Sequence, residues 1–242
     1  FDPKGVIDTG SIMNEVKDNW LESIFDEIKR FYDEIDIQLY GEKAIELGNL
    51  VKPYYPIMNK IQENPVLSFV ADAMRFESKA DAVLLLNQYD YRNIHLNKGI
   101  VTERDIEDLA TYDDNICLVK LTGSDIEKIL NCGVESLNSY NGKQKTGTVQ
   151  VSGLKYTISP QKVSDIYITS GVKEIPLEAD KVYKVVTNPY FMKRANETEN
   201  YDIYNLIKLS NLEKLPYRTK FAVVDYMYKN KDKFSEFTLE PT

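Results

Sequence analysis

The sequence predicts an α+β fold, with a mixed β-sheet flanked by helices and a long helix before it. Helical and strand-like stretches occur in blocks of irregular order instead of strict alternation, which is typical of this class. The run Ala82–Leu86 is wholly apolar and suits a strand that is covered on both faces. The 242 residues, 43% hydrophobic and 28% charged, are enough to bury a large core.

The N-terminal segment predicts a tail followed by an amphipathic helix. Phe1–Gly10 contains Pro and Gly breakers, and Asn14–Asp36 carries apolar residues on one helical face. These are Val16, Trp20, Ile24, Phe25, Ile28, Phe31, Tyr32 and Ile35. Its polar face is mostly Asp and Glu, which argues against a membrane-surface helix. We expect residues 1–40 to form this tail and linker helix, and residues 41–242 to form one domain.

The run Glu63–Arg92 combines a helix, a buried strand and a polar loop. Asn64 suits a helix N-cap and is followed by Pro65, which suits the first helical turn. Apolar residues then recur at intervals of three and four, which predicts one buried helical stripe: Val66, Phe69, Val70, Ala73 and Met74. The strand Ala82–Leu86 follows, and Asn87–Arg92 supplies amides, phenols, a carboxylate and a guanidinium that can bind a planar ligand.

The other elements follow from cap residues, breakers and β-branched enrichment. Predicted strands are Lys43–Leu50, Asn115–Leu121, Thr148–Ser159, Val163–Ser170 and Lys181–Asn188. The sequence predicts four further helices. The first begins at Thr102 or Glu103 and ends near Ala110, and the second runs from its N-cap Ser124 to about Leu137. The other two are Tyr201–Leu209 and Thr219–Lys231. Neither repeats nor low-complexity segments are present.

Composition excludes several classes of function. The net charge of −8, without a Lys/Arg-rich stripe, argues against binding to a nucleic-acid polymer. The single histidine, His95, has neither a second His nor a Cys cluster beside it, so no metal site is expected. The sequence has no G-x-S-x-G nucleophile motif, and we expect no catalytic residue in this chain. Neither a signal peptide nor a transmembrane run is visible, and Cys117 and Cys132 are expected as buried thiols.

An ordered series of motifs resembles a known family. Glu63–Met74 matches E-x-x-L-G-N-L-V-A-D-A-M, and Asn87–Arg92 matches N-G-G-G-I-R. Further matches are Gly99–Thr102 to G-x-I-T, Thr111–Asn115 to P-F-x-N, Leu121–Gly123 to L-T-G, Gln150–Tyr156 to Q-V-S-G-L-x-Y and Val185–Phe191 to V-x-T-N-x-F-L. From about Gly41 to its end, the chain resembles the C-terminal domain of the 5′-nucleotidase and 2′,3′-cyclic-nucleotide phosphodiesterase family.

The resemblance implies a set of nucleotide-binding residues. It places the base between the rings of Tyr112 and Tyr190, and puts Asn87 and Arg92 on the nucleoside or its phosphate. Glu199 stands in for the family's ribose-binding Asp. The alternative is that the two tyrosines, among 17 in the chain, pack at the edge of the core. In that alternative Asn87 forms a turn and Arg92 lies on the surface.

The sequence departs from the family at several places, including Leu67 in place of a glycine and the lack of an upstream Arg among Met58–Gln62, and two departures concern the predicted site directly. Bulky Gln88, Tyr89 and Asp90 replace three glycines, so backbone that could approach a ligand closely now carries side chains. The late G-G-D-G-Y motif is replaced by the segment from Ala195 to Tyr201, which is about three residues longer. These changes leave nucleotide specificity open.

The resemblance also implies a role within a larger protein. Family members hydrolyse phosphate esters in a separate N-terminal metallophosphatase domain with two divalent metal ions, and this chain would position a nucleoside or nucleotide for it. The partner would be that domain in the same polypeptide, and the compartment extracellular, cell wall or periplasmic. The alternatives are a degenerate, non-catalytic surface module of the same fold, or a binder of another aromatic metabolite.

Overall fold

The computed structural model describes residues 44–54, 63–86, 96–109, 115–138, 148–189 and 212–239, and six positions between 23 and 34. The chain divides into two compact units, Phe1–Ile45 and Glu46–Thr242. The six described positions between 23 and 34, in the first unit, are helical, as the sequence predicts: Ser23, Ile24, Glu27, Arg30, Phe31 and Glu34. The strands and the other described helices belong to the second unit.

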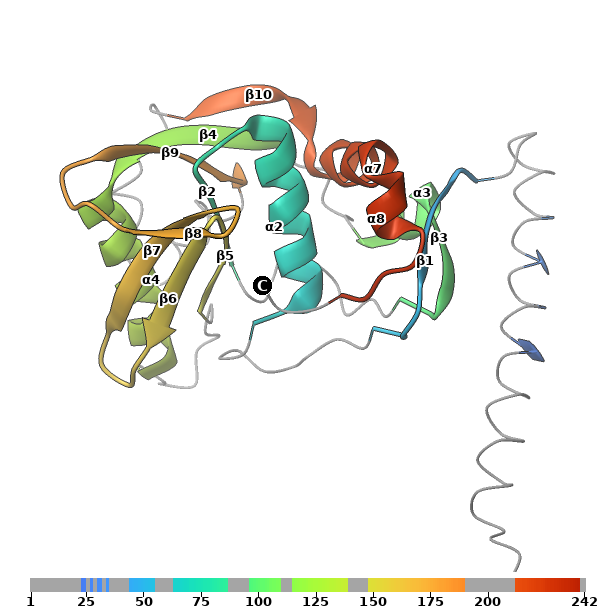
Figure 1. Cartoon of the computed structure of the whole chain (residues 1–242), viewed down its shortest axis with the longest axis horizontal. Coiled ribbons are helices and arrows are strands. Elements are labelled where there is room, and N and C mark those ends of the chain that lie inside the picture. Colours follow the sequence, from blue (N-terminus) through green and yellow to red (C-terminus); the bar gives the residue numbers. More distant parts are fainter. Residues whose placement is uncertain are drawn as a thin grey trace, which may run out of the picture. The chain divides into compact units, whose positions relative to one another are not determined.

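A five-stranded sheet in the order β10-β4-β9-β2-β5 runs through the second unit (Figure 1). Its strands are β2 (Ala82–Leu86), β4 (Asn115–Thr122), β5 (Val149–Ser152), β9 (Val182–Thr187) and β10 (Glu213–Arg218). Strands β2 and β9 are parallel, whereas the other three neighbouring pairs are antiparallel. The sheet is therefore mixed, as the sequence predicts.

Helix α2 (Pro65–Ser78) confirms the predicted cap and stripe. The Asn64 side-chain oxygen accepts hydrogen bonds from the backbone N–H groups of Val66 at 3.0 Å and Leu67 at 3.4 Å. The five residues of the predicted apolar stripe are all buried. The helix ends at Lys79, which adopts a left-handed conformation with φ of 56° and donates its N–H to the Arg75 carbonyl.

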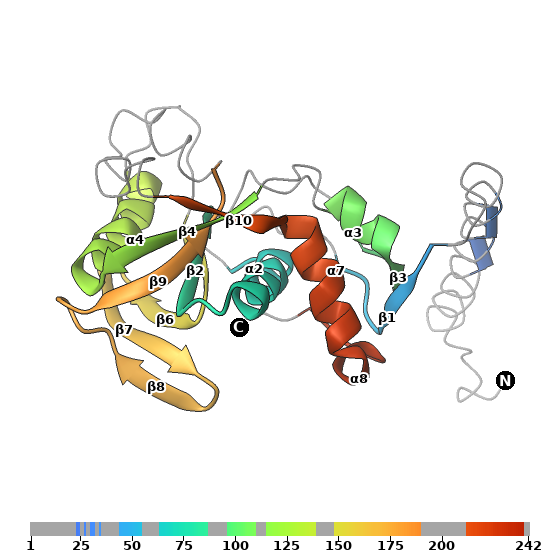
Figure 2. The same ribbon diagram turned by 90° about the horizontal axis from the view of Figure 1, so that it is seen from above.

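Apolar cores cover both faces of the five-stranded sheet. Val83 and Leu85 of β2 pack in a core with α2 and α7 (Thr219–Lys229), whereas Ala82 and Leu84 pack in a core with α4 (Gly123–Asn138). Figure 2 shows strands β4, β9 and β2 between α4 and α2. Successive strand residues point to opposite faces, so an unbroken apolar strand is the consequence of this double cover.

Smaller sheets surround the central one. Strands β6 (Leu154–Ile158), β7 (Val163–Ser170) and β8 (Lys173–Pro176) form an antiparallel sheet in that order, and β1 (Glu46–Leu50) pairs with β3 (Gly99–Thr102). The predicted single strand Thr148–Ser159 is two strands, because Gly153 turns the chain with φ of +74°. Only glycine adopts that conformation without steric cost.

Two helices begin with the same reciprocal cap. Thr102 precedes α3 (Glu103–Leu109), and its N–H and hydroxyl both donate to the Asp105 carboxylate at 2.7 Å. Thr122 precedes α4 and contacts Asp125 in the same way, while the Asp125 N–H donates back to the Thr122 hydroxyl at 3.2 Å. The prediction that Ser124 caps α4 was therefore wrong by two residues.

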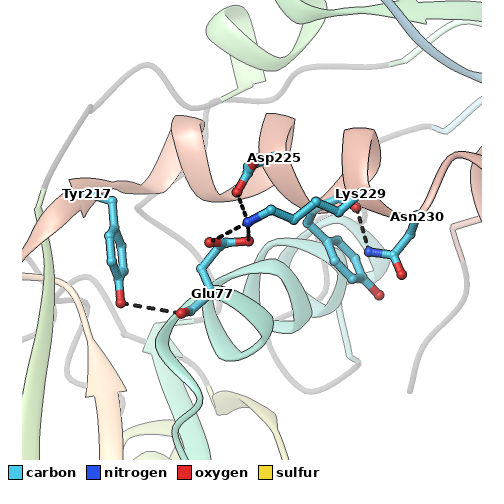
Figure 3. Close-up of polar contacts among 6 residues, drawn as sticks. Glu77, Tyr217, Asp225, Lys229 and Asn230 are labelled. Carbon is cyan, nitrogen blue, oxygen red and sulfur yellow. Dashed lines mark hydrogen bonds and ion pairs between the residues drawn. The ribbon is translucent and has the colours of Figure 1, made fainter.

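The C-terminal elements are joined to α2 by polar contacts (Figure 3). Lys229 of α7 contacts the Glu77 carboxylate at 3.2 Å and the Asp225 carboxylate one turn earlier in its own helix. The Tyr217 hydroxyl donates to the backbone carbonyl of Glu77 at 3.4 Å. Lys229 is half exposed, so these ion pairs fix the register of α7 on α2 more than they stabilise it. The chain then turns into α8 (Lys231–Phe234).

Candidate functional site

The strands that adjoin the predicted site residues all begin or end at the same edge of the five-stranded sheet. We call it the carboxyl edge, because the parallel strands β2 and β9 both end there, at Leu86 and Thr187. The antiparallel strand β4 begins at the same edge, since its Cys117 lies opposite Thr187. Strand β5 also begins there, with Val149 opposite Leu86.

The five sequence-predicted site residues lie outside the described residues, so their side chains are not placed: Asn87, Arg92, Tyr112, Tyr190 and Glu199. The attachment points of three of them are described. Asn87 directly follows β2, Tyr190 is three residues after the end of β9, and Tyr112 is three residues before the start of β4. All three therefore connect to the carboxyl edge.

Polar side chains are buried along this edge. The Thr187 hydroxyl is buried and donates to the Leu84 carbonyl at 2.8 Å, which ties β9 to β2 at the point where both strands end. Asn188, the next residue, is only 4% exposed. The backbone leaving β9 toward Tyr190 is thus held in the interior instead of at the protein surface.

The N-terminus of α2 adds a connected set of hydrogen bonds beside β5. The Tyr54 hydroxyl donates to the Asn64 side-chain oxygen at 2.8 Å, and the Asn64 N–H donates to the side-chain oxygen of Gln150 at 2.8 Å. The Ser68 hydroxyl donates to the Glu63 carboxylate at 2.9 Å. These contacts satisfy the helix end internally.

Gln150 stands out within this set. Its side chain is 3% exposed and its oxygen accepts from Asn64, but its amide N–H₂ has no acceptor among the described residues. A buried amide donor without an acceptor is costly, so such groups mark places that a water or a ligand completes. Sequence reasoning assigned Gln150 no role, although a Gln inside the apolar strand V-Q-V was a visible signal.

Tyr156 lies close to this set of residues, and its hydroxyl acts as a hydrogen-bond donor. Its hydroxyl donates to the Val149 carbonyl at 2.6 Å. Burial, and to a smaller extent the negative charge of Glu63, raises the pKa of the Tyr156 phenol well above its ordinary value. The phenol therefore stays neutral and serves to fix the start of β5.

The A-D-A-M and Q-V-S-G motifs meet in space and hold the fold together. The Ser152 hydroxyl donates to the Asp72 carboxylate at 2.6 Å, which joins β5 to α2. Arg75 donates to the Thr169 carbonyl of β7 at 2.7 Å. A Cβ on Gly153 would lie 2.3 Å from the Asp81 carbonyl and 2.5 Å from the Arg75 side chain, so only glycine fits. These motif residues are structural.

The described part of the chain shows neither a metal cluster nor a membrane helix. Within it, no group of three His, Cys, Asp or Glu side chains is arranged to hold a metal ion. Its helices are too short or too polar to cross a bilayer. Cys117 is buried and Cys132 partly so, and neither is in a disulfide.

Several solved structures share this fold. A 5′-nucleotidase precursor from Thermus thermophilus matches 90% of this chain at 13% identity with a TM-score of 0.62. The NAD nucleotidase of Haemophilus influenzae matches 90% at 15% identity with a TM-score of 0.65, and the sulfate thiohydrolase SoxB of Thermus thermophilus matches 90% at 12% identity with a TM-score of 0.58. The chain spans only about 40% of the length of these structures.

The family assignment comes from the sequence itself. A search of curated proteins found no match. The model of the 5′-nucleotidase C-terminal domain, in contrast, matches residues 49–205, which is well over half of the 242 residues. That span runs from β1 through β9 and includes the carboxyl edge. The chain belongs to the 5′-nucleotidase C-terminal domain family.

Proposed function

We propose that this chain is the substrate-binding domain of a 5′-nucleotidase-like phosphoesterase, and that it holds a nucleoside or nucleotide at the carboxyl edge. Tyr112 and Tyr190 stack on the two faces of the base, Asn87 and Arg92 contact its polar groups or phosphate, and Glu199 contacts the ribose. The observation that carries the proposal is that the strand ends nearest in sequence to Asn87, Tyr112 and Tyr190 lie together at one edge of the sheet.

The dimensions of the edge suit a base held between two rings. Strands β4 and β9 are direct neighbours, so their ends are separated by about 5 Å. Tyr112 and Tyr190 are each three residues from a strand end, a reach of at most about 10 Å. Two rings that stack on one base stand about 7 Å apart, which is two contacts of about 3.5 Å. The three residues between each strand end and its tyrosine are long enough to place the two rings at this separation.

Gln150 supports the same location. Its amide N–H₂ lies near the start of β5 at the carboxyl edge, where a ligand oxygen or ring nitrogen would satisfy it. A ligand that accepts these hydrogen bonds removes the cost of a buried unpaired donor. This gives the site a polar contact beyond those implied by the family resemblance.

Hydrolysis, in this proposal, belongs to a separate N-terminal metallophosphatase domain of the same polypeptide, which would carry two divalent metal ions. The present chain captures the substrate and presents it to that domain by rotation about the linker helix. Two of the similar structures are a 5′-nucleotidase and an NAD nucleotidase, and the chain corresponds to about 40% of each. We place the protein outside the cytoplasm, in the periplasm, cell wall or extracellular space.

Isothermal titration calorimetry with adenosine and AMP tests the proposal. The wild-type chain is expected to show saturable binding, which the Tyr112→Ala/Tyr190→Ala variant loses, because stacking on each ring contributes about 1–3 kcal/mol. The Tyr112→Phe/Tyr190→Phe variant keeps the rings and should keep the binding. Tyr228→Ala is the matched control, since Tyr228 is an exposed tyrosine on α7, away from the carboxyl edge.

The opposite results are equally informative. An absence of heat with adenosine and AMP, in a chain that is folded by circular dichroism, would contradict the proposal and favour a degenerate surface module. Binding that survives the loss of both rings would place the nucleoside elsewhere. Saturable binding of aromatic compounds other than nucleosides would favour another aromatic metabolite as the ligand.

A further inference from the structure

A groove of about 510 Å³ lies on the far half of α2, away from the carboxyl edge. Its floor is one face of that helix, formed by Asp72, Arg75, Phe76 and Lys79 at intervals of three and four residues. Ser152 of β5 and Tyr226 of α7 line it as well. At 1.5 Å per residue, Phe76 is about 18 Å along the helix from Asn64, so the groove is separate from the proposed nucleotide site.

The groove has more positive charge than its single carboxylate can balance. Its lining holds two cations, Arg75 and Lys79, against the one carboxylate of Asp72, and the charges of nearby Lys233 and Glu63 are opposite in sign. The Asp72 carboxylate already accepts a hydrogen bond from the Ser152 hydroxyl at 2.6 Å, and burial raises the pKa of this carboxyl above its ordinary value. The local excess of charge is therefore positive, although the whole chain carries −8.

The two groove cations of α2 keep hydrogen-bonding capacity. Arg75 is held in place because it donates to the Thr169 carbonyl at 2.7 Å and packs against Gly153. That bond uses one of the five N–H groups of the guanidinium, and it is the one hydrogen bond that the Arg75 side chain donates within the described residues. The Lys79 ammonium lies 5.3 Å from the centre of the Phe76 ring and has no carboxylate partner in the same part of the chain.

Aromatic rings form the other part of the lining. The centres of the Phe76 and Tyr226 rings are 5.0 Å apart, with planes tilted by 50°. The Tyr226 hydroxyl accepts a hydrogen bond from the Lys233 ammonium at 2.6 Å, which fixes that ring. A fixed guanidinium and an exposed ammonium thus lie beside apolar ring surface, in a volume typical of small-molecule sites.

We propose that this groove is a second binding site, specific for a small organic anion in which a phosphate or carboxylate is attached to a planar apolar body. The anionic group pairs with Arg75 and Lys79, and the apolar body rests against Phe76 and Tyr226. A fork-shaped guanidinium in a fixed position suits either anionic group, because both present two oxygens in the required geometry. The site does not depend on the proposed nucleotide function.

Phenyl phosphate is the probe, and amide chemical shifts from ¹⁵N NMR of the full chain are the readout. Saturable shifts are expected at Arg75, Lys79 and Ser152 at low ionic strength, where charge pairing is least screened. Benzyl alcohol carries the same ring without the charge and should give no saturable shift. The Tyr112→Ala/Tyr190→Ala variant should bind phenyl phosphate unchanged, so failure of the nucleotide site and failure of this site are distinguishable.

Charge substitutions complete the test. Lys79→Gln removes an exposed cation without disturbing the core and should weaken phenyl phosphate binding about fivefold. Lys162→Gln, which removes an exposed cation at the opposite end of β7 from Thr169, should change it less than about twofold. Equal binding of benzyl alcohol, no effect of Lys79→Gln, or shifts confined to Leu86 and Thr187 would each overturn the proposal.

Discussion

The two ends of α2 use their polar residues differently. At the N-terminal end Asn64, Ser68 and Glu63 are bonded to one another or to neighbouring backbone, and the buried side-chain amide of Gln150 has no acceptor for its N–H₂ among the described residues. At the C-terminal end the Arg75 guanidinium and the Lys79 ammonium keep unused hydrogen-bond donors, and Lys79 lies over the Phe76 ring. The comparison indicates that the family motifs in this helix mostly specify the fold, whereas the ligand contacts that we propose come from groups that the fold leaves unsatisfied.

The largest effect is expected at the turn that joins the two motifs. Gly153→Ala should lower the free energy of unfolding by about 3 kcal/mol or more, since the new Cβ would contact the Asp81 carbonyl and Arg75 in a left-handed conformation. Gly171→Ala is the control, because Gly171 has φ of +60° but open space around it. It should cost only the conformational strain of about 1 kcal/mol. Urea denaturation measures both, and equal losses would contradict the packing at Gly153.

A somewhat smaller effect is expected at the N-terminal end of α2. Asn64→Ala removes the acceptor for two backbone N–H groups and for the Tyr54 hydroxyl, and should cost about 2 kcal/mol. Asn64→Asp keeps an acceptor and should retain most of the stability. Thermal unfolding of the two variants compares them. An equal loss of stability in the two variants would show that the Asn64 cap does not stabilise the N-terminal end of α2.

Gln150→Met tests whether the Gln150 side chain contributes both to the stability of the fold and to the proposed ligand binding. The variant keeps the volume but removes the acceptor of the Asn64 N–H, so the free energy of unfolding should fall by about 1 kcal/mol. If the amide donors face the ligand, adenosine should also bind about fivefold more weakly to the folded variant. Calorimetry under conditions where the variant is fully folded separates the two effects. Unchanged adenosine affinity would remove Gln150 from the site.

The smallest effect is a pH dependence at Asp72. Burial raises the pKa of this carboxyl above its ordinary 3.8, so its stabilising contribution is complete below pH 3.8 and is lost as pH rises through the raised pKa. Asn at this position cannot ionise. The stability of Asp72→Asn relative to wild type should therefore increase with pH from about 3.8 and then level off. Denaturation curves over this range check the sign, and a decrease would contradict it.

Much of the fold could be predicted because local signals agreed with tertiary packing. The bounds of β2, the cap of α2 and the starts of α3, β4 and α7 follow from the sequence. Strands β8 and β10 could not be predicted, since each contains a proline, Pro176 and Pro216, and a charged, exposed pattern. Both are edge strands, where a missing N–H is tolerated.

The candidate site could be predicted only in part. Topology brings the strand ends nearest to Asn87, Tyr112 and Tyr190 to one edge, and a sequence cannot show this convergence without the strand order. The roles of these residues stay predictions, together with those of Arg92 and Glu199. The groove cations were missed because Arg75 and Lys79 resemble ordinary helix-surface charges until β5 and α7 are packed beside them.

The most direct test of the central claim is the location of bound adenosine, measured by ¹⁵N NMR of the labelled chain. The account predicts saturable amide shifts at Leu86, Asn115 and Thr187, at the ends of three adjacent strands of the carboxyl edge. Residues of the β7–β8 hairpin such as Lys173 should not respond. Shifts centred on the groove, or no shift at any adenosine concentration, would contradict the account.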